Sequence, residues 1–172
     1  LAYREARFDE ARALMKRVAR TGKLYPVALD HYFTDAAVAS LAAIAEELNR
    51  EHGAQSDTYM ALKASCVTGV AEGWLCNREG GGIRYGRIFK PADDLHGFSV
   101  DVVDMKDIAG PHHTHPHGEI DLIMPIEGDA RFDGRPAGWL VCPPGSAHRP
   151  TVSQGRALVL YLLPQGRIDF TR

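Results

Sequence analysis

Apolar residues in the first third of the chain recur with the period of an α-helix. This spacing, together with residues that can cap a helix, predicts three helical segments. The first ends near Gly22, and its apolar stripe is formed by Phe8, Ala11, Met15 and Val18. The second begins at Thr34 or Asp35 and ends at Gly53, with an apolar stripe formed by Val38, Leu41, Ala42, Ala45 and Leu48. Ser56 can cap a short third helical turn through Tyr59 and Leu62.

From about Gly69 the apolar period changes to two, and glycine or proline interrupts the pattern every ~8 to 12 residues. Asp133-Gly134 is a dipeptide typical of a tight turn, whereas Glu79 to Gly82 indicates a flexible loop. The pattern favours a mainly β protein in a single domain, with a helical N-terminal segment over residues 1–65 and a β-barrel over residues 69–172. The predicted strands are Gly73–Cys76, Ile83–Phe89, Phe98–Met105, Ile120–Ile126, Ala130–Phe132, Gly138–Cys142 and Ala157–Leu163.

The composition narrows the class of protein. The chain has 172 residues, 45% of them hydrophobic, and its 20 Lys and Arg nearly balance its 22 Asp and Glu. This is enough apolar material for one core, and the near-neutral charge disfavours disorder and a nucleic-acid partner. The longest run of small apolar residues, 36–45, is shorter than the ~20 residues that a membrane span needs, so no membrane association is expected.

The cysteines and the first residues of the chain bear on its location. Cys66, Cys76 and Cys142 form an odd set without CxxC spacing, which predicts neither a disulfide framework nor a thiolate zinc site. The first residues are charged and amphipathic, without the apolar core of a signal peptide. We therefore expect a reducing, cytoplasmic location.

Four of the eight histidines fall within six residues, His112 to His117, in the segment GPHHTHPHGEID. Alternate residues of a strand project from one face, so His113 with His115, or His115 with His117, could bind one metal at ~2.0 to 2.1 Å. A carboxylate that follows a turn, Glu119 or Asp121, could complete the same site. His148, after the turn in PPGSAH, could approach from a neighbouring strand.

These segments resemble the two motifs of the cupin superfamily. HTHPHGE matches the first motif, HxHx3E, at His113, His115 and Glu119, and PPGSAH matches the second, PxGxxH, with its histidine at His148. The resemblance implies a double-stranded β-helix, or jelly roll, that holds a divalent metal on three histidines and one glutamate. A shifted set, His115, His117 and Asp121, is the alternative, and we favour the first set because Glu reaches further than Asp.

A longer stretch of sequence resembles a narrower family. The runs HTHPHGEIDLIMPIEGDARFDG and GWLVCPPGSAHRPTVSQGRALVLYLLPQGRIDF, after a helical N-terminal third, are similar to the 4-hydroxylaminobenzoate lyases of nitroaromatic degradation. That family implies conversion of 4-hydroxylaminobenzoate and water into 3,4-dihydroxybenzoate and ammonia. The N–O bond is the internal oxidant, so no nicotinamide or flavin is needed, and no GxGxxG follows a strand. The ligand set favours Fe, Mn, Zn, Ni or Co over Mg.

Such a reaction predicts further roles for side chains. The substrate, a small aromatic carboxylate, needs a forked cation, for which the candidates are Arg84, Arg87 and Arg149. The N–O oxygen needs a proton donor, for which the candidates are His117, Asp121, Tyr85, and Glu119 if it is not a ligand. Trp139, beside the second motif, is the preferred apolar wall for the ring.

Two other functions remain open from the residues alone. An Fe(II) cupin dioxygenase acting on an aromatic or other small acid would use the same four ligands, and oxygen consumption would distinguish it. A non-catalytic metal-binding or sensor cupin would bind metal without turnover. For any of the three we expect a homodimer. Because three imidazoles must be neutral to bind a metal, metal and activity should be lost as pH falls toward about 6.

Overall fold

The computed structural model describes residues 35–171, so the helix predicted over Phe8–Val18 lies outside the described residues. Two helices precede an almost entirely β remainder, and a short 3-10 turn, η1 (Asp93–Leu95), joins β2 to β3. The helices are α3 (Asp35–His52) and α4 (Asp57–Ala71). The strands are β1 (Arg78–Gly80), β2 (Ile83–Phe89), β3 (Phe98–Ala109), β4 (His113–His115), β5 (Glu119–Phe132), β6 (Gly138–Cys142), β7 (Ser146–His148), β8 (Thr151–Pro164) and β9 (Asp169–Phe170).

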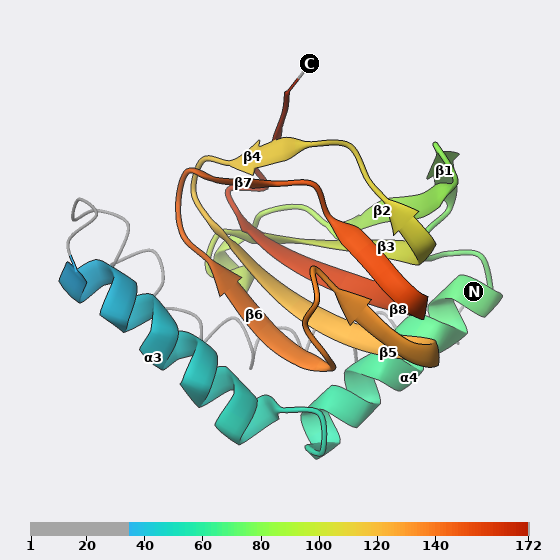
Figure 1. Ribbon diagram of the computed structural model, residues 1–172, viewed down its shortest axis with the longest axis horizontal. Coiled ribbons are helices and arrows are strands. Elements are labelled where there is room, and N and C mark those ends of the chain that lie inside the picture. The colour runs from blue at the N-terminus through green and yellow to red at the C-terminus, as the bar shows by residue number, and fades with distance from the viewer. Residues whose placement is uncertain (1–34, 172) are drawn as a thin grey trace.

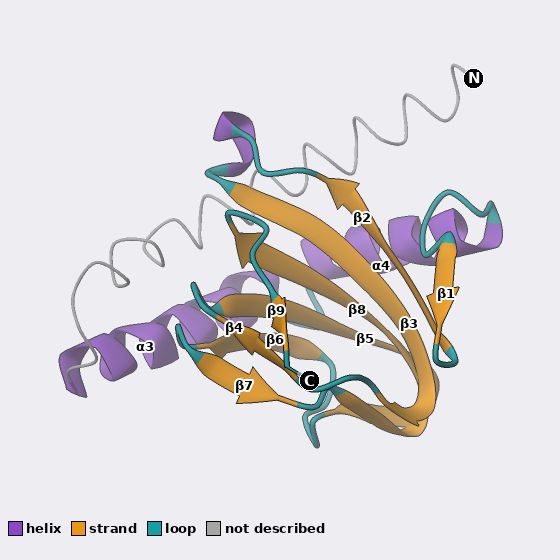
Figure 2. Ribbon diagram, turned by 90° about the horizontal axis from the view of Figure 1, so that it is seen from above, coloured by secondary structure: helices purple, strands orange, loops and turns teal. Residues whose placement is uncertain are grey.

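The strands form two antiparallel sheets. The larger has the order β1-β2-β3-β8-β5-β6, and the smaller has the order β7-β4-β9. The small sheet covers one face of the large sheet, whereas α3 and α4 cover the opposite face (Figure 1). From above, the small sheet lies over β5, β6 and β8, away from β1 (Figure 2). The expected fold class, a mainly β sandwich with a helical N-terminal segment, is confirmed.

Alternation along the central strands separates two apolar clusters. Ile120, Leu122 and Met124 of β5 pack in the cluster that includes α3 and α4, whereas Ile123 packs in the cluster between the sheets. Because neighbouring strand residues point to opposite faces, Glu119 and Asp121 share the inner face with Ile123. Two carboxylates that start β5 are thereby placed in the interior between the sheets, next to the small sheet that carries the histidines.

One predicted strand, Gly73–Cys76, is wrong. Helix α4 is a full helix rather than the short turn expected, and Ser56 caps it by accepting the N–H of Tyr59 at 3.1 Å. At the other end the N–H groups of Trp74 and Leu75 donate to the carbonyl of Gly69. These donors complete the end of the helix and are not available to a β-ladder.

The remaining β predictions are partly correct. The bounds of β2 and β6 are those expected, but β5 is one long strand with bulges where two strands were expected. Residues 79–82, expected as a flexible loop, instead form the end of β1 and a tight turn into β2. The Asp133-Gly134 turn is confirmed, and both residues have positive φ, 48° and 76°, as a type I′ turn requires.

Asn49 of α3 covers the free edge of the large sheet at β6. Its Nδ2 donates to the carbonyl of Trp139 at 2.8 Å, and its Oδ1 accepts the N–H of Trp139 at 2.9 Å. Gly138 beside it must lack a side chain, because a Cβ there would lie 2.6 Å from Asn49 Oδ1. The amide thus pairs with the strand backbone as another strand would.

Replacing Asn49 with Ala should therefore lower the free energy of unfolding by about 2 to 4 kcal/mol, since both backbone groups of Trp139 lose their partners. Chemical denaturation of the purified protein measures this change. Arg50→Ala is the control, because the Arg50 side chain is 69% exposed and should change stability by less than ~0.5 kcal/mol. Equal stabilities of the two variants would contradict the edge-pairing role of Asn49.

The described residues also bear on two expectations about cysteines and membranes. Among the described residues, Cys66, Cys76 and Cys142 form no disulfide. Within residues 35–171 no helix has the length and apolar character needed to cross a membrane.

Candidate metal centre

Strands β4, β7 and β5 bring four side chains from separate parts of the chain to one point. His113 on β4 lies directly opposite His148 on β7, and His115 lies two residues further along the same face of β4. One donor atom from each of His113, His115, Glu119 and His148 lies within 4.8 Å of the others. His113, His115 and Glu119 are buried, whereas the His148 side chain is 20% exposed, so the cluster is reached from the side of His148.

The donor atoms are spaced as metal ligands are. The Nε2 atom of His148 lies 3.1 Å from that of His113 and 3.3 Å from that of His115. Glu119 places Oε2 2.9 Å from His115 Nε2 and Oε1 3.7 Å from His148 Nε2. Around an ion with bonds of ~2.0 to 2.2 Å, neighbouring donors lie about 2.8 to 3.6 Å apart. The cluster is therefore compatible with a divalent metal.

The other ring nitrogens explain why these donors face one another. The Nδ1 atom of His113 lies 3.1 Å from the carbonyl oxygen of Pro111, and that of His148 lies 2.6 Å from Asp133 Oδ2. Carbonyl and carboxylate oxygens only accept, so both Nδ1 atoms carry the proton and both Nε2 atoms present lone pairs to the cluster. Converging lone pairs repel each other unless a cation lies between them.

Burial and nearby charges shift the pKa values of His113 and His148 in opposite directions. Burial, followed by the positive charges of His115 and His148, lowers the pKa of His113 to about 4. Burial also acts to lower the pKa of His148, but the hydrogen bond to Asp133 and the charges of Glu119 and Asp133 outweigh it and raise that pKa. His113 is thus a neutral ligand well below pH 6, the value expected to limit metal binding.

A second group of side chains shares Glu119. Donor atoms of Glu119, Asp121 and Cys142 lie within 4.8 Å of one another, on adjacent strands β5 and β6. Within the described residues no N–H donor reaches the buried oxygens of Asp121. Burial, and then the neighbouring charge of Glu119, raises the pKa of Asp121 well above its ordinary value. The spacing of the cysteines had suggested no role for Cys142, but its thiol borders these two carboxyl groups.

Arg84 and Trp139 lie on the face of the large sheet that carries the helices, away from the cluster. Trp139 is 5% exposed, and its indole N–H donates to the carbonyl of His52 at 2.7 Å. Arg84 is opposite Asp104, with 3.8 Å between guanidinium and carboxylate. This differs from the expectation that both residues contact substrate, because alternation along β2 and β6 turns them outward.

Tyr85 and Arg87 are on β2, with β3 and β8 between them and β5. Three strand spacings separate β2 from β5 by about 14 Å. Arg87 donates to Asp101 at 2.8 Å and to the carbonyl of Gly166 at 2.9 Å, so it holds the loop that leads to β9. The structure therefore does not bring Tyr85 or Arg87 together with the four clustered side chains.

The other two predicted residues are nearer to the cluster. His117 lies half-buried in the turn between β4 and β5, and it does not belong to the His113, His115, Glu119 and His148 group. Arg149 directly follows His148 and donates to the carbonyl of Gly110 at 3.2 Å. Of the two registers left open by the sequence, the described residues thus bring together the first.

Sequence reasoning missed three side chains near the cluster. Tyr161 of β8 lies directly opposite Asp121, and burial and the nearby carboxyl groups raise its pKa well above its ordinary value. The charge of Arg135 acts on the Cys142 thiol, so this guanidinium lies near the second group. Asp133 was expected only as a turn residue. The alternation of β8 could have indicated Tyr161, but no sequence signal places Asp133 or Arg135.

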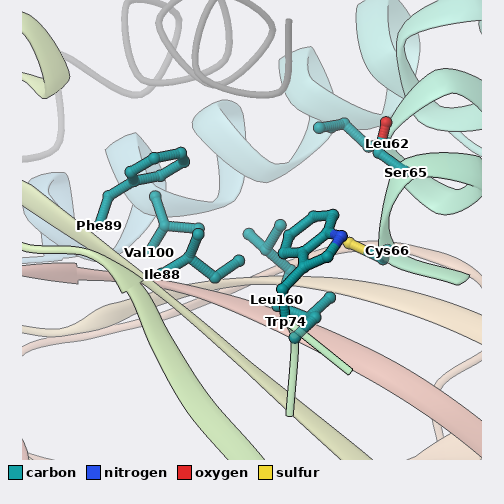
Figure 3. Close-up of a pocket in the computed structure, with 9 residues that line it drawn as sticks. Leu62, Ser65, Cys66, Trp74, Ile88, Phe89, Val100 and Leu160 are labelled. Carbon is teal, nitrogen blue, oxygen red and sulfur yellow. The ribbon is translucent and has the colours of Figure 1, made fainter. Parts of the chain in front are cut away.

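A small apolar cavity lies elsewhere in the molecule. Its volume is about 20 Å³, and it lies between α4 and the outer face of the large sheet, bordered by Cys66, Trp74 and Leu160 (Figure 3). These side chains offer no convergent polar groups that would orient a ligand. The cavity is a packing gap in the core between the helices and the large sheet. The candidate functional side chains lie on the other face, between the two sheets.

The fold and the clustered ligands define the class of protein. An antiparallel two-sheet sandwich whose interior joins HxHx3E on β4 and β5 to PxGxxH on β7 is a cupin. A family model described as 4-hydroxylaminobenzoate lyase (PnbB) matches residues 33–170, and the chain belongs to that family.

Two relatives named 4-hydroxylaminobenzoate lyase agree with this assignment. The 4-hydroxylaminobenzoate lyase of Pseudomonas putida is 33% identical, and the match covers 72% of this chain and 80% of that protein. The enzyme of the same name from Nocardioides sp. (strain LMS-CY) is also 33% identical, over 72% of this chain and 78% of that protein. An RmlC-like cupin from Shewanella frigidimarina has a TM-score of 0.38 and 22% identity, covering 51% of this chain and 80% of that one.

Proposed function

We propose that this protein is a metal-dependent lyase that converts 4-hydroxylaminobenzoate, or a closely related hydroxylamino aromatic acid, into 3,4-dihydroxybenzoate and ammonia. The observation that carries the proposal is the buried cluster of three histidines and one glutamate, with a second carboxyl group, Asp121, beside it. The membership of this chain in the 4-hydroxylaminobenzoate lyase family supports the same reaction.

The reaction balances without an external oxidant. The N–O bond breaks with its electron pair on oxygen, which leaves as water after protonation, while a water molecule adds to the neighbouring ring carbon. Hydrolysis of the resulting C=N bond then consumes a second water and releases ammonia. Tautomerisation restores the aromatic ring as 3,4-dihydroxybenzoate. The chain must therefore position the substrate, supply one proton to the leaving oxygen and admit water.

His113, His115, His148 and Glu119 are the proposed ligands. When bound, a transition-metal dication of the Fe, Mn, Zn, Ni or Co class supplies charge stabilisation and a site that acidifies water. Three neutral imidazoles and one carboxylate around a dication give a local charge of about +1, which attracts an anionic aromatic acid. The donor atoms of the four side chains are spaced for this role.

Asp121 is the proposed proton donor to the leaving oxygen. Its side chain is fully buried on the same face as Glu119, and no N–H group in the described part of the chain occupies its oxygens. Arg149, beside His148, and Arg135, near Cys142, are the proposed cations for the substrate carboxylate. Arg149 is next to His148 in the sequence, whereas Arg84 lies on the helix-covered face of the large sheet.

Incubation of the purified, metal-containing protein with 4-hydroxylaminobenzoate under nitrogen should release ammonia and 3,4-dihydroxybenzoate in equal amounts. An enzymatic ammonia assay and liquid chromatography of the products measure this ratio. The matched control substrate is 4-aminobenzoate, which lacks the N–O bond and should release no ammonia.

Other outcomes of this experiment would overturn the proposal. Turnover only in air, with oxygen consumed, would indicate the cupin dioxygenase instead. Metal binding without turnover of the hydroxylamine under either atmosphere would indicate a metal-binding or sensor module.

A further inference from the structure

Asp133 connects the β5–β6 turn to the histidine of the second motif. Its Oδ2 lies 2.6 Å from His148 Nδ1, and its Oδ1 accepts the backbone N–H of Thr151 at 2.8 Å. The backbone N–H of Asp133 also donates to the carbonyl of Thr151 at 2.8 Å. One carboxylate therefore contacts both the end of β7 and the start of β8, and its own position is held from two sides.

We propose that Asp133 is a positioning residue that holds His148 in the tautomer and orientation needed to bind the metal. The inference rests on the proposed metal cluster, but it does not depend on the substrate. A neutral imidazole carries one N–H, and an ionised carboxylate can only accept. Asp133 thus keeps the proton on Nδ1 and leaves the Nε2 lone pair directed at His113 and His115.

The other ligands show why His148 needs this partner. His113 is oriented by the carbonyl of Pro111. His115 is fully buried, and its Nε2 lies 2.9 Å from Glu119 Oε2. His148 is the most exposed of the four and lies on β7, an edge strand of the small sheet, whereas His113 and His115 lie on the central strand β4. A histidine in such a place can rotate or exchange its tautomer unless a side chain holds its second nitrogen, and partners of this kind tune metal affinity.

The turn that contains Asp133 can accommodate asparagine at this position without a change of backbone conformation. Asp133 and Gly134 both have positive φ, and Asn-Gly fits a type I′ turn as well as Asp-Gly does. In Asp133→Asn the amide oxygen can still accept the N–H of Thr151, which turns the NH2 group toward His148 Nδ1. That group donates, so it favours the tautomer with the proton on Nε2, which cannot bind a metal.

The matched control is Asp107→Asn. Asp107 also has positive φ, 45°, and its Oδ1 accepts a backbone N–H, that of Gly155, at 2.9 Å. Asp107 lies at the bulge of β3, and its carboxylate has no contact with the four clustered side chains. The two variants therefore make the same chemical change in similar backbone settings, and only one of them faces a proposed ligand.

The test measures Co(II) affinity of the metal-stripped proteins at one pH by competition with a chelator, together with the Co(II) absorption spectrum. Asp133→Asn should bind Co(II) about 10- to 100-fold more weakly than the unmodified protein and alter the spectrum. Asp107→Asn should stay within about twofold, because no ligand has changed. Affinity of Asp133→Asn equal to that of the control would overturn the inference.

A second measurement applies even if Asp133→Asn is less stable. Ring-nitrogen NMR of the metal-free protein, at a pH where His148 is neutral, should show its proton on Nδ1, and Asp133→Asn should shift that proton toward Nε2. A metal-free, unmodified protein in which neutral His148 carries its single proton on Nε2 would overturn the inference. Failure of the lyase assay with both results as expected would refute the proposed reaction and leave the role of Asp133 intact.

Discussion

Replacing His115 with Ala should abolish stoichiometric metal binding and lower kcat/KM by more than ~100-fold, because removing even a partner of a ligand typically costs 10- to 100-fold. His115 is fully buried, and its Nε2 lies close to donor atoms of both Glu119 and His148. No other imidazole in the described cluster can take its position, since His113 and His148 already supply their own Nε2 atoms. Elemental analysis and steady-state kinetics of the same preparation measure both losses.

Two further variants make this result interpretable. His112→Ala removes an exposed imidazole from the same segment, one residue before β4, and should keep both metal and activity. His148→Ala removes the most exposed ligand, so it tests the cluster with less risk to folding if His115→Ala is unstable. Full metal content in folded His115→Ala and His148→Ala would refute the metal centre.

Replacing Asp121 with Asn should lower kcat by about 10²- to 10⁴-fold while metal content stays unchanged, as expected for loss of a general acid. The amide is nearly the same size as the carboxyl group but cannot deliver a proton to the leaving oxygen. The Asp121 side chain lies beside the Glu119 carboxylate, and the NH2 group of the new amide can donate to that acceptor, so the substitution should change stability little. Kinetics, elemental analysis and thermal unfolding together measure these effects.

Asp129→Asn is the control for this second variant, because Asp129 is on the same strand with its side chain 78% exposed. It should retain the kcat of the unmodified protein. Loss of metal in Asp121→Asn would assign Asp121 to the ligand set instead. Unchanged kcat would exclude it as the proton donor and leave His117, in the β4–β5 turn, as the remaining predicted candidate near the cluster.

The metal cluster itself could be predicted from the sequence because its spacing is local. His113 and His115 are two residues apart in one strand, so any β conformation projects them from one face. Glu119 follows after one turn, and the Pro-Gly turn before His148 marks the start of a neighbouring strand. The motifs therefore limited the ligands to two alternative sets, and the structure brings together the first of them.

The roles assigned to isolated residues were less predictable. Trp139 lies three residues before Cys142, but the parity of β6 turns it toward α3 while Leu140 and Cys142 share the face of Asp121. Arg87 is on a strand whose distance from β5 is decided by the sheet order, which the sequence does not state. Local patterning does not show which face of the sheet a given residue occupies, because a register shift of one residue reverses it. It also does not show how many strands separate two residues in the sheet.

By itself, the sequence determined the mainly β class, the helical segment before it and the two motifs, and it limited the ligands to two alternative sets. Each of these depends on the period of the backbone or on turn residues, which act over a few positions. Only the tertiary structure decided that Asp133 meets His148, that Tyr161 lies opposite Asp121, and that Arg84 and Trp139 face the helices. Those contacts depend on strand order and register, which are set by packing among residues far apart in the chain.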